Sequence, residues 1–157
     1  MGILVLISIT LCLALLDITV KSTVESSMTQ KEERTACKGK VIFRKVYNRG
    51  FSFSLCEKKE ELVKYGSAIA ATILTIWQLF TLMCKKQRLR KWGLSLMTAG
   101  AWSNTFDRWF RGYVIDYIGF QTKWKKVTAI TFNLADFMIG AGSVLVVLSS
   151  VFRKKRK

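Results

Sequence analysis

The chain of 157 residues is half hydrophobic, yet it carries 26 Lys and Arg against 10 acidic residues, a formal net charge of +16. This length predicts one domain over residues 1–157. The apolar and charged residues fall in separate blocks, a pattern typical of membrane spans joined by charged loops. Because the basic residues are spread over every loop and the C-terminus, we expect contacts with anionic membrane lipids and no binding to nucleic acid.

The sequence contains no His, and its four cysteines show no CxxC spacing. It therefore lacks the commonest general base and the commonest zinc ligand, and we expect neither a metal site nor a cofactor. Cys37 and Cys56 share one long loop and could form a disulfide if that loop faces an oxidising compartment.

Four apolar stretches are each about long enough to cross roughly 30 Å of hydrocarbon as a helix. They cover residues 3–20, 65–83, 92–110 and 128–152. The first lacks the basic n-region of a cleavable signal peptide, so we interpret it as a retained span. The sequence thus predicts an all-α membrane protein with four transmembrane helices.

Basic residues predict the orientation of these spans. The connection 84–91 holds five Lys and Arg in eight residues, and the tail 153–157 is entirely basic. Under the positive-inside rule both face the cytoplasm, which places both termini there as well. Residues 21–64 then form an extracytoplasmic loop, in which eleven Lys and Arg are diluted by six Glu.

Part of this loop has the pattern of a small sheet. Residues 40–55 alternate apolar and polar side chains around a predicted turn at Asn48-Arg49-Gly50. Such alternation on both sides of a turn indicates paired strands. We therefore expect a small extracytoplasmic β-rich cradle in the first loop.

The few Asp residues stand where hydrophobicity alone would not place them. An ionised carboxylate at membrane depth costs roughly 2.5–3.5 kcal/mol even on lenient scales, so each is a functional-site hypothesis. Polar residues fall on one helical face in each of the last two stretches, at intervals of three and four. These faces comprise Gly100, Asn104, Asp107, Arg108 and Arg111 in the third stretch, and Asn133, Asp136, Gly140 and Ser143 in the fourth.

Two of these carboxylates could act together. Asp116 follows the outer end of the third stretch, and Asp136 lies within the fourth. If the segment holding Asp116 folds back over the bundle, the pair meets near the outer membrane surface and shares one proton. That is aspartic-protease chemistry, which needs neither His nor metal. A dyad of Ser103 and Lys21 is the alternative, and Asp136 could also serve a purely structural hydrogen bond between helices.

The other two Asp residues have a structural interpretation. Asp17 and Lys21 are spaced i to i+4, which predicts a salt bridge at a helix end. Asp107 lies beside Arg108, which predicts a buried ion pair at the outer end of the third span.

Taken together, the motifs resemble the lipoprotein signal peptidase family, also called signal peptidase II. Residues 99–108 (AGAWSNTFDR) and 111–118 (RGYVIDYI) resemble its GNxxDR…GxVxDF signature, and residues 132–136 (FNLAD) resemble its FNxAD signature. Asp17 and Lys21 match its D-x-x-x-K element, and residues 48–54 (NRGFSFS) resemble its NxGxxFS element. These motifs occur in the right order across nearly the whole chain.

The resemblance implies an intramembrane aspartic endopeptidase with Asp116 and Asp136 as its catalytic pair. Its substrates would be bacterial prolipoproteins that carry a diacylglyceryl-cysteine, cut on the amino side of that cysteine in the cytoplasmic (inner) membrane. We expect the enzyme to be a monomer. Further residues that would line or support the site are Asn48, Gly50, Gly100, Asn104, Arg108 and Asn133.

The chain departs from the family pattern at several positions. Ala99 and Ser103 stand where Gly is usual, Phe51 and Ser52 follow the turn glycine in place of two small residues, and the Pro before the FN motif is missing. These changes bear on the shape of the pocket more than on the carboxylate pair.

Two other functions fit the hydrophobic pattern. One is a non-enzymatic small membrane protein, such as a channel or assembly factor, with structural Asp residues. The other is a proton-coupled transporter that uses Asp136 as its relay, although the sequence shows neither an internal repeat nor a broken helix.

Overall fold

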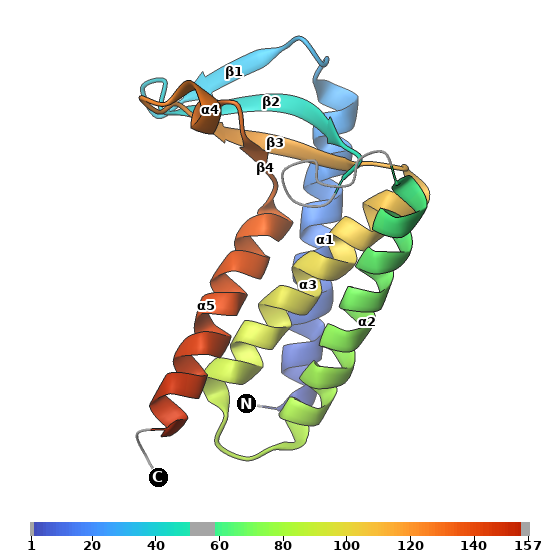
Figure 1. Ribbon diagram of the computed structural model, residues 1–157, viewed down its shortest axis with the longest axis vertical. Coiled ribbons are helices and arrows are strands. Elements are labelled where there is room, and N and C mark those ends of the chain that lie inside the picture. The colour runs from blue at the N-terminus through green and yellow to red at the C-terminus, as the bar shows by residue number, and fades with distance from the viewer. Residues whose placement is uncertain (1, 51–58, 155–157) are drawn as a thin grey trace.

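Four long helices stand side by side and a small sheet crosses one end of the bundle (Figure 1). The computed structural model describes residues 2–50 and 59–154. The long helices are α1 (Ile3–Ser27), α2 (Glu60–Met83), α3 (Arg88–Phe110) and α5 (Leu134–Lys154). Both ends of the chain and the α2–α3 turn lie at the end of the bundle opposite the sheet.

Within the described residues, three helices are long and apolar enough to cross a membrane: α1, α2 and α5. Four transmembrane helices were expected, but α3 is too polar to count as a candidate span by its length and composition. Its position explains that polarity: α3 packs against all three other long helices. Ser95, Ser103 and Asn104 on this helix are buried against protein, where polar groups find hydrogen-bonding partners.

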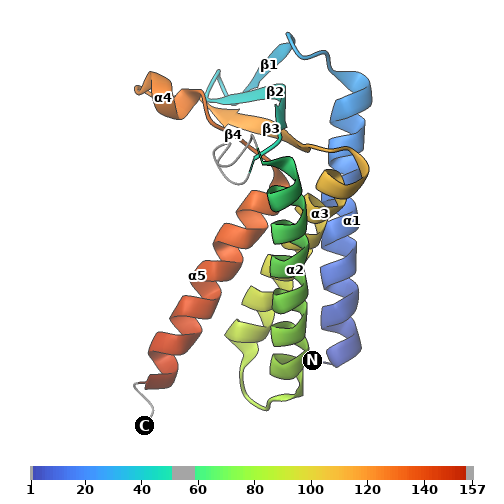
Figure 2. The same ribbon diagram turned by 45° about the vertical axis from the view of Figure 1, so that its right-hand side comes forward.

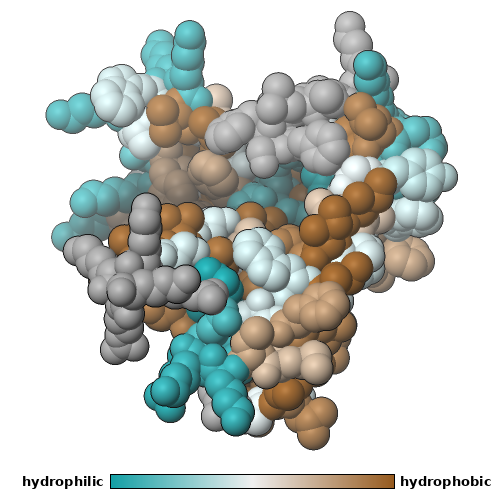
Figure 3. Space-filling model, turned by 60° about the horizontal axis from the view of Figure 1, so that its bottom comes forward, coloured by the Kyte–Doolittle hydropathy of each residue, from teal (hydrophilic) through white to brown (hydrophobic). Residues whose placement is uncertain are grey.

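Apolar side chains cover the outward faces of the bundle. Leu4, Leu15, Ile69, Phe80 and Val147 are each exposed by more than half of their surface. Seen from the end that carries the termini, apolar side chains dominate the helix flanks, and hydrophilic ones project in separate clusters (Figure 3). Such apolar flanks are what lipid contact requires.

Glycines allow α3 and α5 to approach closely. A Cβ atom at Gly142 would lie 2.5 Å from the Gly93 carbonyl oxygen, and one at Gly100 would lie 2.5 Å from the Ala135 carbonyl oxygen. Small residues of this kind let membrane helices pack backbone to backbone. Gly100 therefore allows α3 to lie close to the first turn of α5.

The sheet has four antiparallel strands in the order β1-β2-β3-β4. They are β1 (Glu33–Ala36), β2 (Val41–Asn48), β3 (Val114–Phe120) and β4 (Thr131–Phe132), with the short helix α4 (Lys125–Thr128) before the last. The expected cradle in the first loop is thus present as β1 and β2. The all-α class is met only in part, however, since the segment between α3 and α5 supplies two further strands.

Some predicted boundaries also need correction. The first helix continues beyond residue 20 to Ser27. The fourth predicted span begins too early, because residues 131–132 pair with β3 and α5 starts only at Leu134. Phe51 to Leu55 of the predicted cradle, and Cys56 of the considered disulfide, lie outside the described residues.

Figure 2 shows the sheet reaching sideways beyond the bundle over the top of α5.

Replacing Gly142 by Ala should destabilise the bundle by about 1–3 kcal/mol, since the new methyl group meets the backbone of α3 and neither helix can move freely. Gly140→Ala is the matched control on the same helix, because within residues 2–50 and 59–154 no atom beyond its chain neighbours and the backbone of its own helix turn lies within 4 Å of a Cβ there. Thermal unfolding in detergent should show a lower midpoint for Gly142→Ala only. Equal midpoints for the two variants would contradict this account of the α3–α5 contact.

Candidate active site

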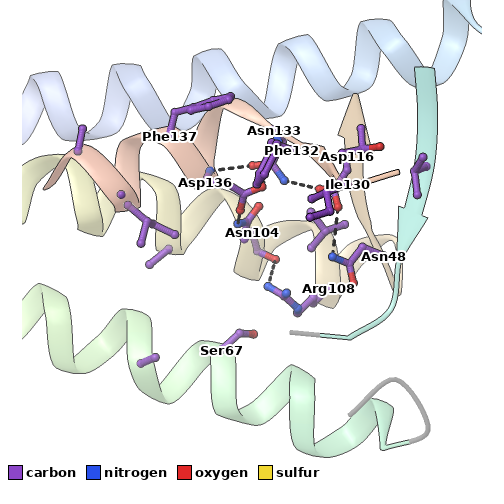
Figure 4. Close-up of a pocket in the computed structure, with 18 of the residues that line it drawn as sticks. Asn48, Ser67, Asn104, Arg108, Asp116, Ile130, Phe132, Asn133, Asp136 and Phe137 are labelled. Atoms are coloured by element: carbon purple, nitrogen blue, oxygen red, sulfur yellow. Dashed lines mark hydrogen bonds between the residues drawn. The ribbon is translucent and has the colours of Figure 1, made fainter. Parts of the chain in front are cut away.

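Asn133 joins the two carboxylates proposed from the sequence. Its side-chain Nδ2 donates to Asp116 Oδ1 at 2.6 Å, and its backbone N–H donates to Asp136 Oδ2 at 3.0 Å. Asp116 lies in the middle of β3, and Asp136 lies in the first turn of α5. The two residues thus share one neighbour, as Figure 4 shows. The direct or water-mediated reach expected between their carboxyl groups stays a prediction.

The start of α5 explains this geometry. Asn133 Oδ1 accepts the backbone N–H of Asp136 at 3.0 Å, while Asp136 Oδ2 accepts the backbone N–H of Asn133. This reciprocal pair is a capping box, which satisfies N–H groups that have no partner inside the helix. Because the amide oxygen of Asn133 is held by the helix, its NH₂ group must point to Asp116.

Two further amides are oriented in the same way. Asn48 Oδ1 accepts the Gly50 N–H at 3.0 Å, so its Nδ2 turns to Asp116 Oδ2 at 3.1 Å. Asn104 Oδ1 accepts the Lys21 ammonium at 2.7 Å, so its Nδ2 turns to Asp136 Oδ1 at 3.3 Å. Each carboxylate therefore receives a hydrogen bond on both of its oxygens. This arrangement holds both carboxyl groups in place.

Burial nevertheless makes the charge on Asp116 expensive. The residue is 5% exposed. Burial first, and then the charge of Asp136, raise the pKa of Asp116 from 3.8 to about 7, against the lowering effect of its hydrogen bonds from Asn48 and Asn133. Near neutral pH this carboxyl group can thus hold or release a proton.

Both carboxylates line one cavity of about 930 Å³. Its polar side carries the three amides and Arg108, which donates to the Gly50 carbonyl oxygen at 2.9 Å and to the Asn104 carbonyl oxygen at 3.2 Å. Gly50 is thereby linked to the cavity lining through Arg108. The other lining residues are mostly apolar: Val46, Ser67, Ala70, Ala101, Val114, Ala129, Ile130, Thr131, Phe132, Phe137, Ile139, Gly140 and Ala141.

Behind the carboxylates lies a buried ionic cluster centred on Lys21. Its Nζ atom lies 2.8 Å from Asp17 Oδ2, 3.0 Å from Asp107 Oδ2 and 3.2 Å from Ser103 Oγ. The side chains of Lys21, Asp17 and Asp107 are all fully buried. Arg111 also pairs with Asp107. The predicted salt bridge of Asp17 with Lys21 is confirmed, and Asp107 gains two partners that the sequence did not single out.

Tyr117 connects this cluster to α5. Its hydroxyl donates to Asp17 Oδ1 at 3.2 Å and accepts the backbone N–H of Leu134 at 3.2 Å. Burial and the Asp17 charge raise the pKa of Tyr117, so the phenol stays protonated and can donate. Sequence reasoning missed this residue, because the partner that gives it a role is 100 positions away.

The alternative dyad of Ser103 and Lys21 is close in space but inaccessible. Ser103 Oγ donates to Asp17 Oδ2 at 2.6 Å, both side chains of the dyad are fully buried, and neither residue lines the cavity. Among residues 2–50 and 59–154, no group of three or more Cys, Asp or Glu could hold a metal ion.

Comparison with known proteins decides the family. The family model for signal peptidase (SPase) II matches residues 9–152. The chain belongs to the signal peptidase II family. The resemblance inferred from its motifs is thereby confirmed.

Relatives and solved structures agree with this membership. A lipoprotein signal peptidase from Fusobacterium nucleatum is 30% identical over 152 residues, covering 93% of this chain and 87% of the relative. One from Allorhizobium ampelinum is 32% identical over 149 residues, covering 93% and 88%. A solved bacterial membrane enzyme superposes with a TM-score of 0.84 at 20% identity, covering 99% of this chain and 92% of that one. At this identity, the superposition supports the fold alone.

Replacing Lys21 by Met should destabilise the protein by about 3–5 kcal/mol, because two buried carboxylates lose the ammonium between them. Lys123→Met removes the same charge from an exposed position and serves as the control. Chemical or thermal unfolding in detergent measures the difference. If Lys21→Met unfolds at the midpoint of Lys123→Met, the cluster does not hold the bundle together.

Proposed function

We propose that this member of the signal peptidase II family removes the signal peptide from diacylglyceryl-modified prolipoproteins, cutting on the amino side of the lipidated cysteine. One observation carries the proposal: Asp116 and Asp136 are joined through Asn133 in a cavity at the end of a membrane helix bundle. Two carboxylates so arranged can perform peptide hydrolysis without another nucleophile.

The proposed reaction starts with the proton on Asp116, whose raised pKa favours the neutral form. Ionised Asp136 takes a proton from a water molecule as that water attacks the scissile carbonyl carbon. Asp116 meanwhile gives its proton to the carbonyl oxygen. The tetrahedral gem-diol intermediate then collapses: one of its hydroxyl protons returns to Asp116 as the C=O bond reforms, the C–N bond breaks, and the proton taken by Asp136 passes to the departing nitrogen.

The membrane arrangement extends the same proposal. We infer that α3 is the fourth span, shielded from lipid by the other helices, and that the chain acts as a monomer in the bacterial cytoplasmic membrane. The start of α1, the end of α5 and the α2–α3 turn lie together. The five basic residues of 84–91, which span that turn and the start of α3, favour the cytoplasmic side for this end. The sheet and the carboxylates then lie at the outer surface, among the membrane lipids of the outer leaflet.

The rival functions lack comparable support. A channel or assembly factor would not require two carboxylates on one cavity, each hydrogen-bonded on both oxygens. A proton relay through Asp136 would need titratable groups leading onward through the bundle. The cavity residues deeper along α5 are Ile139, Gly140 and Ala141, which cannot carry a proton.

Asp116→Asn and Asp136→Asn should each abolish cleavage of a diacylglyceryl-modified precursor, while the protein stays folded. Asn preserves size but can neither accept nor return the proton. Because the pair acts as one unit, the double variant should be no slower than either single variant. Mass spectrometry of a purified precursor after incubation measures the loss.

Asp107→Asn is the matched comparison, since it neutralises a buried Asp outside the cavity. It should lower the unfolding midpoint, because Lys21 and Arg111 lose a charged partner. A folded Asp136→Asn protein that still cuts at a substantial fraction of the parent rate would overturn the proposal.

The rate should also depend on the protonation of Asp116. Because the reaction begins with this proton in place, kcat/KM should fall as the pH rises through about 7. Asn48→Ala removes a hydrogen bond that favours the ionised form, so the fall should move to higher pH. A pH–rate profile in which the Asn48→Ala limb stays in place, or moves to lower pH, would contradict this role.

A further inference from the structure

One wall of the cavity is a single stretch of chain, residues 129–133, which runs from the end of α4 to the start of α5. Its strand β4 is the edge strand of the sheet and pairs with β3 at two positions, those of Thr131 and Phe132. None of residues 129–132 is buried. A second cavity of about 300 Å³ lies against the same stretch, and Ala129 lines both cavities. Side-chain packing therefore gives this wall little support.

The Arg44 side chain, from β2, supplies the support. Its Nε atom donates to Thr131 Oγ1 at 2.7 Å, and its Nη2 atom donates to the carbonyl oxygens of Thr128 at 2.7 Å and Ile130 at 3.1 Å. Its Nη1 atom lies 3.7 Å from the exposed carboxylate of Glu33. Hydrogen bonds from a charged donor are stronger than those between neutral groups. Because two of the three acceptors are main-chain groups, these bonds fix the path of the backbone.

The fold prepares a path for this side chain. Arg44 falls in a β-bulge, where the register of β2 with β3 shifts between Phe43 and Val46. A bulge gives a side chain a direction that regular alternation along the strand would not. The guanidinium group then crosses β3 at Gly119, where a Cβ atom would lie 3.3 Å from Nη2. The glycine thus leaves room for Arg44 to reach from β2 to the wall.

The carboxylates of the cavity are held separately from this wall. Asp116 and Asp136 receive their hydrogen bonds from the three amides described above, and the hydrogen bonds of Arg44 within the described residues go to other groups. At the far end of the wall, the ring of Phe132 contacts the rings of two other Phe residues. Arg44 therefore acts on residues 128–131 and leaves the carboxylate pair to its own partners.

We propose that Arg44 is a positioning residue for the substrate, which holds residues 128–131 in place and so sets the width of the cavity beside the carboxylates. The inference rests on the proposed function and adds a residue that controls substrate binding at the same site. Arg44 is not among the residues that line this cavity, so it acts through the backbone of the wall. Loosening the wall weakens substrate binding but preserves the geometry of the carboxylates. Such a change raises KM and leaves kcat unchanged.

Arg44→Lys tests this role, because it keeps the charge but loses the planar fork that contacts three oxygens at once. It should raise KM for a diacylglyceryl-modified precursor by roughly tenfold and change kcat by less than about twofold. Thr131→Val removes the hydroxyl that accepts from Nε and keeps a similar shape, so it should raise KM less. In the double variant the two effects should not add, because both substitutions break the same contact.

Arg34→Lys is the matched control, since Arg34 is an exposed residue on β1 of the same sheet and contacts Glu32 and Ser27. It should change neither KM nor kcat. Amide hydrogen exchange of the whole protein in detergent gives a second measurement that needs no substrate. In Arg44→Lys, exchange should be faster over residues 127–132 and unchanged over residues 114–118 of β3.

The proposal is overturned if Arg44→Lys fails to raise KM, or fails to speed exchange over residues 127–132. A fall in kcat as large as the rise in KM would also overturn it, since the carboxylates would then depend on Arg44. Equal acceleration of exchange in both segments would make Arg44 a general stabiliser of the sheet and would likewise refute it. Failure of the parent protein to cut the precursor would overturn the proposed function, while the exchange measurement would still decide whether Arg44 holds the wall.

Discussion

The side-chain amide of Asn133 connects the helix bundle to the sheet through hydrogen bonds. Its oxygen caps the first turn of α5, and its nitrogen reaches Asp116 on the sheet. One side chain therefore fixes the helix start, the position of the sheet over the bundle and the spacing of two carboxylates. Because the amide oxygen is held by a backbone N–H group, the direction of the NH₂ group is determined by the fold and not by the substrate.

Charges in the protein are divided between two places with different tasks. The Lys21 cluster is sealed among α1 and α3 and balances its ammonium against two carboxylates. The cavity keeps Asp116 and Asp136 open to a substrate, and it holds them mainly by neutral amides. Asn104 touches both regions, since it accepts from Lys21 and donates to Asp136. The Lys21 cluster thereby orients the Asn104 amide toward Asp136, and it places no positive charge in direct contact with the Asp136 carboxylate.

The polarity of α3 follows from the same division. α3 supplies Ser103, Asn104 and Asp107 to buried hydrogen bonds and ion pairs. A helix with such polar side chains cannot be surrounded by lipid on every side. The bundle resolves this by placing α3 inside, where α1, α2 and α5 cover it, and by using glycines to bring α5 close. The cost of burying these polar groups is offset because they find partners on neighbouring elements.

The sequence by itself determined the apolar helices α1, α2 and α5, the family motifs and the Asp17–Lys21 pair, because these depend on local composition and spacing. It also proposed Asp116 and Asp136 as a pair, and both line the same cavity. Asn133 and Asp136 also have the spacing of an N-cap pair, and this local pattern marks the start of the last helix. The tertiary structure alone decided the partners of Asp107, the role of Tyr117, the strands β3 and β4, and the partners of Arg44. Each of these depends on contacts between residues far apart in the chain, and local periodicity carries no information about them.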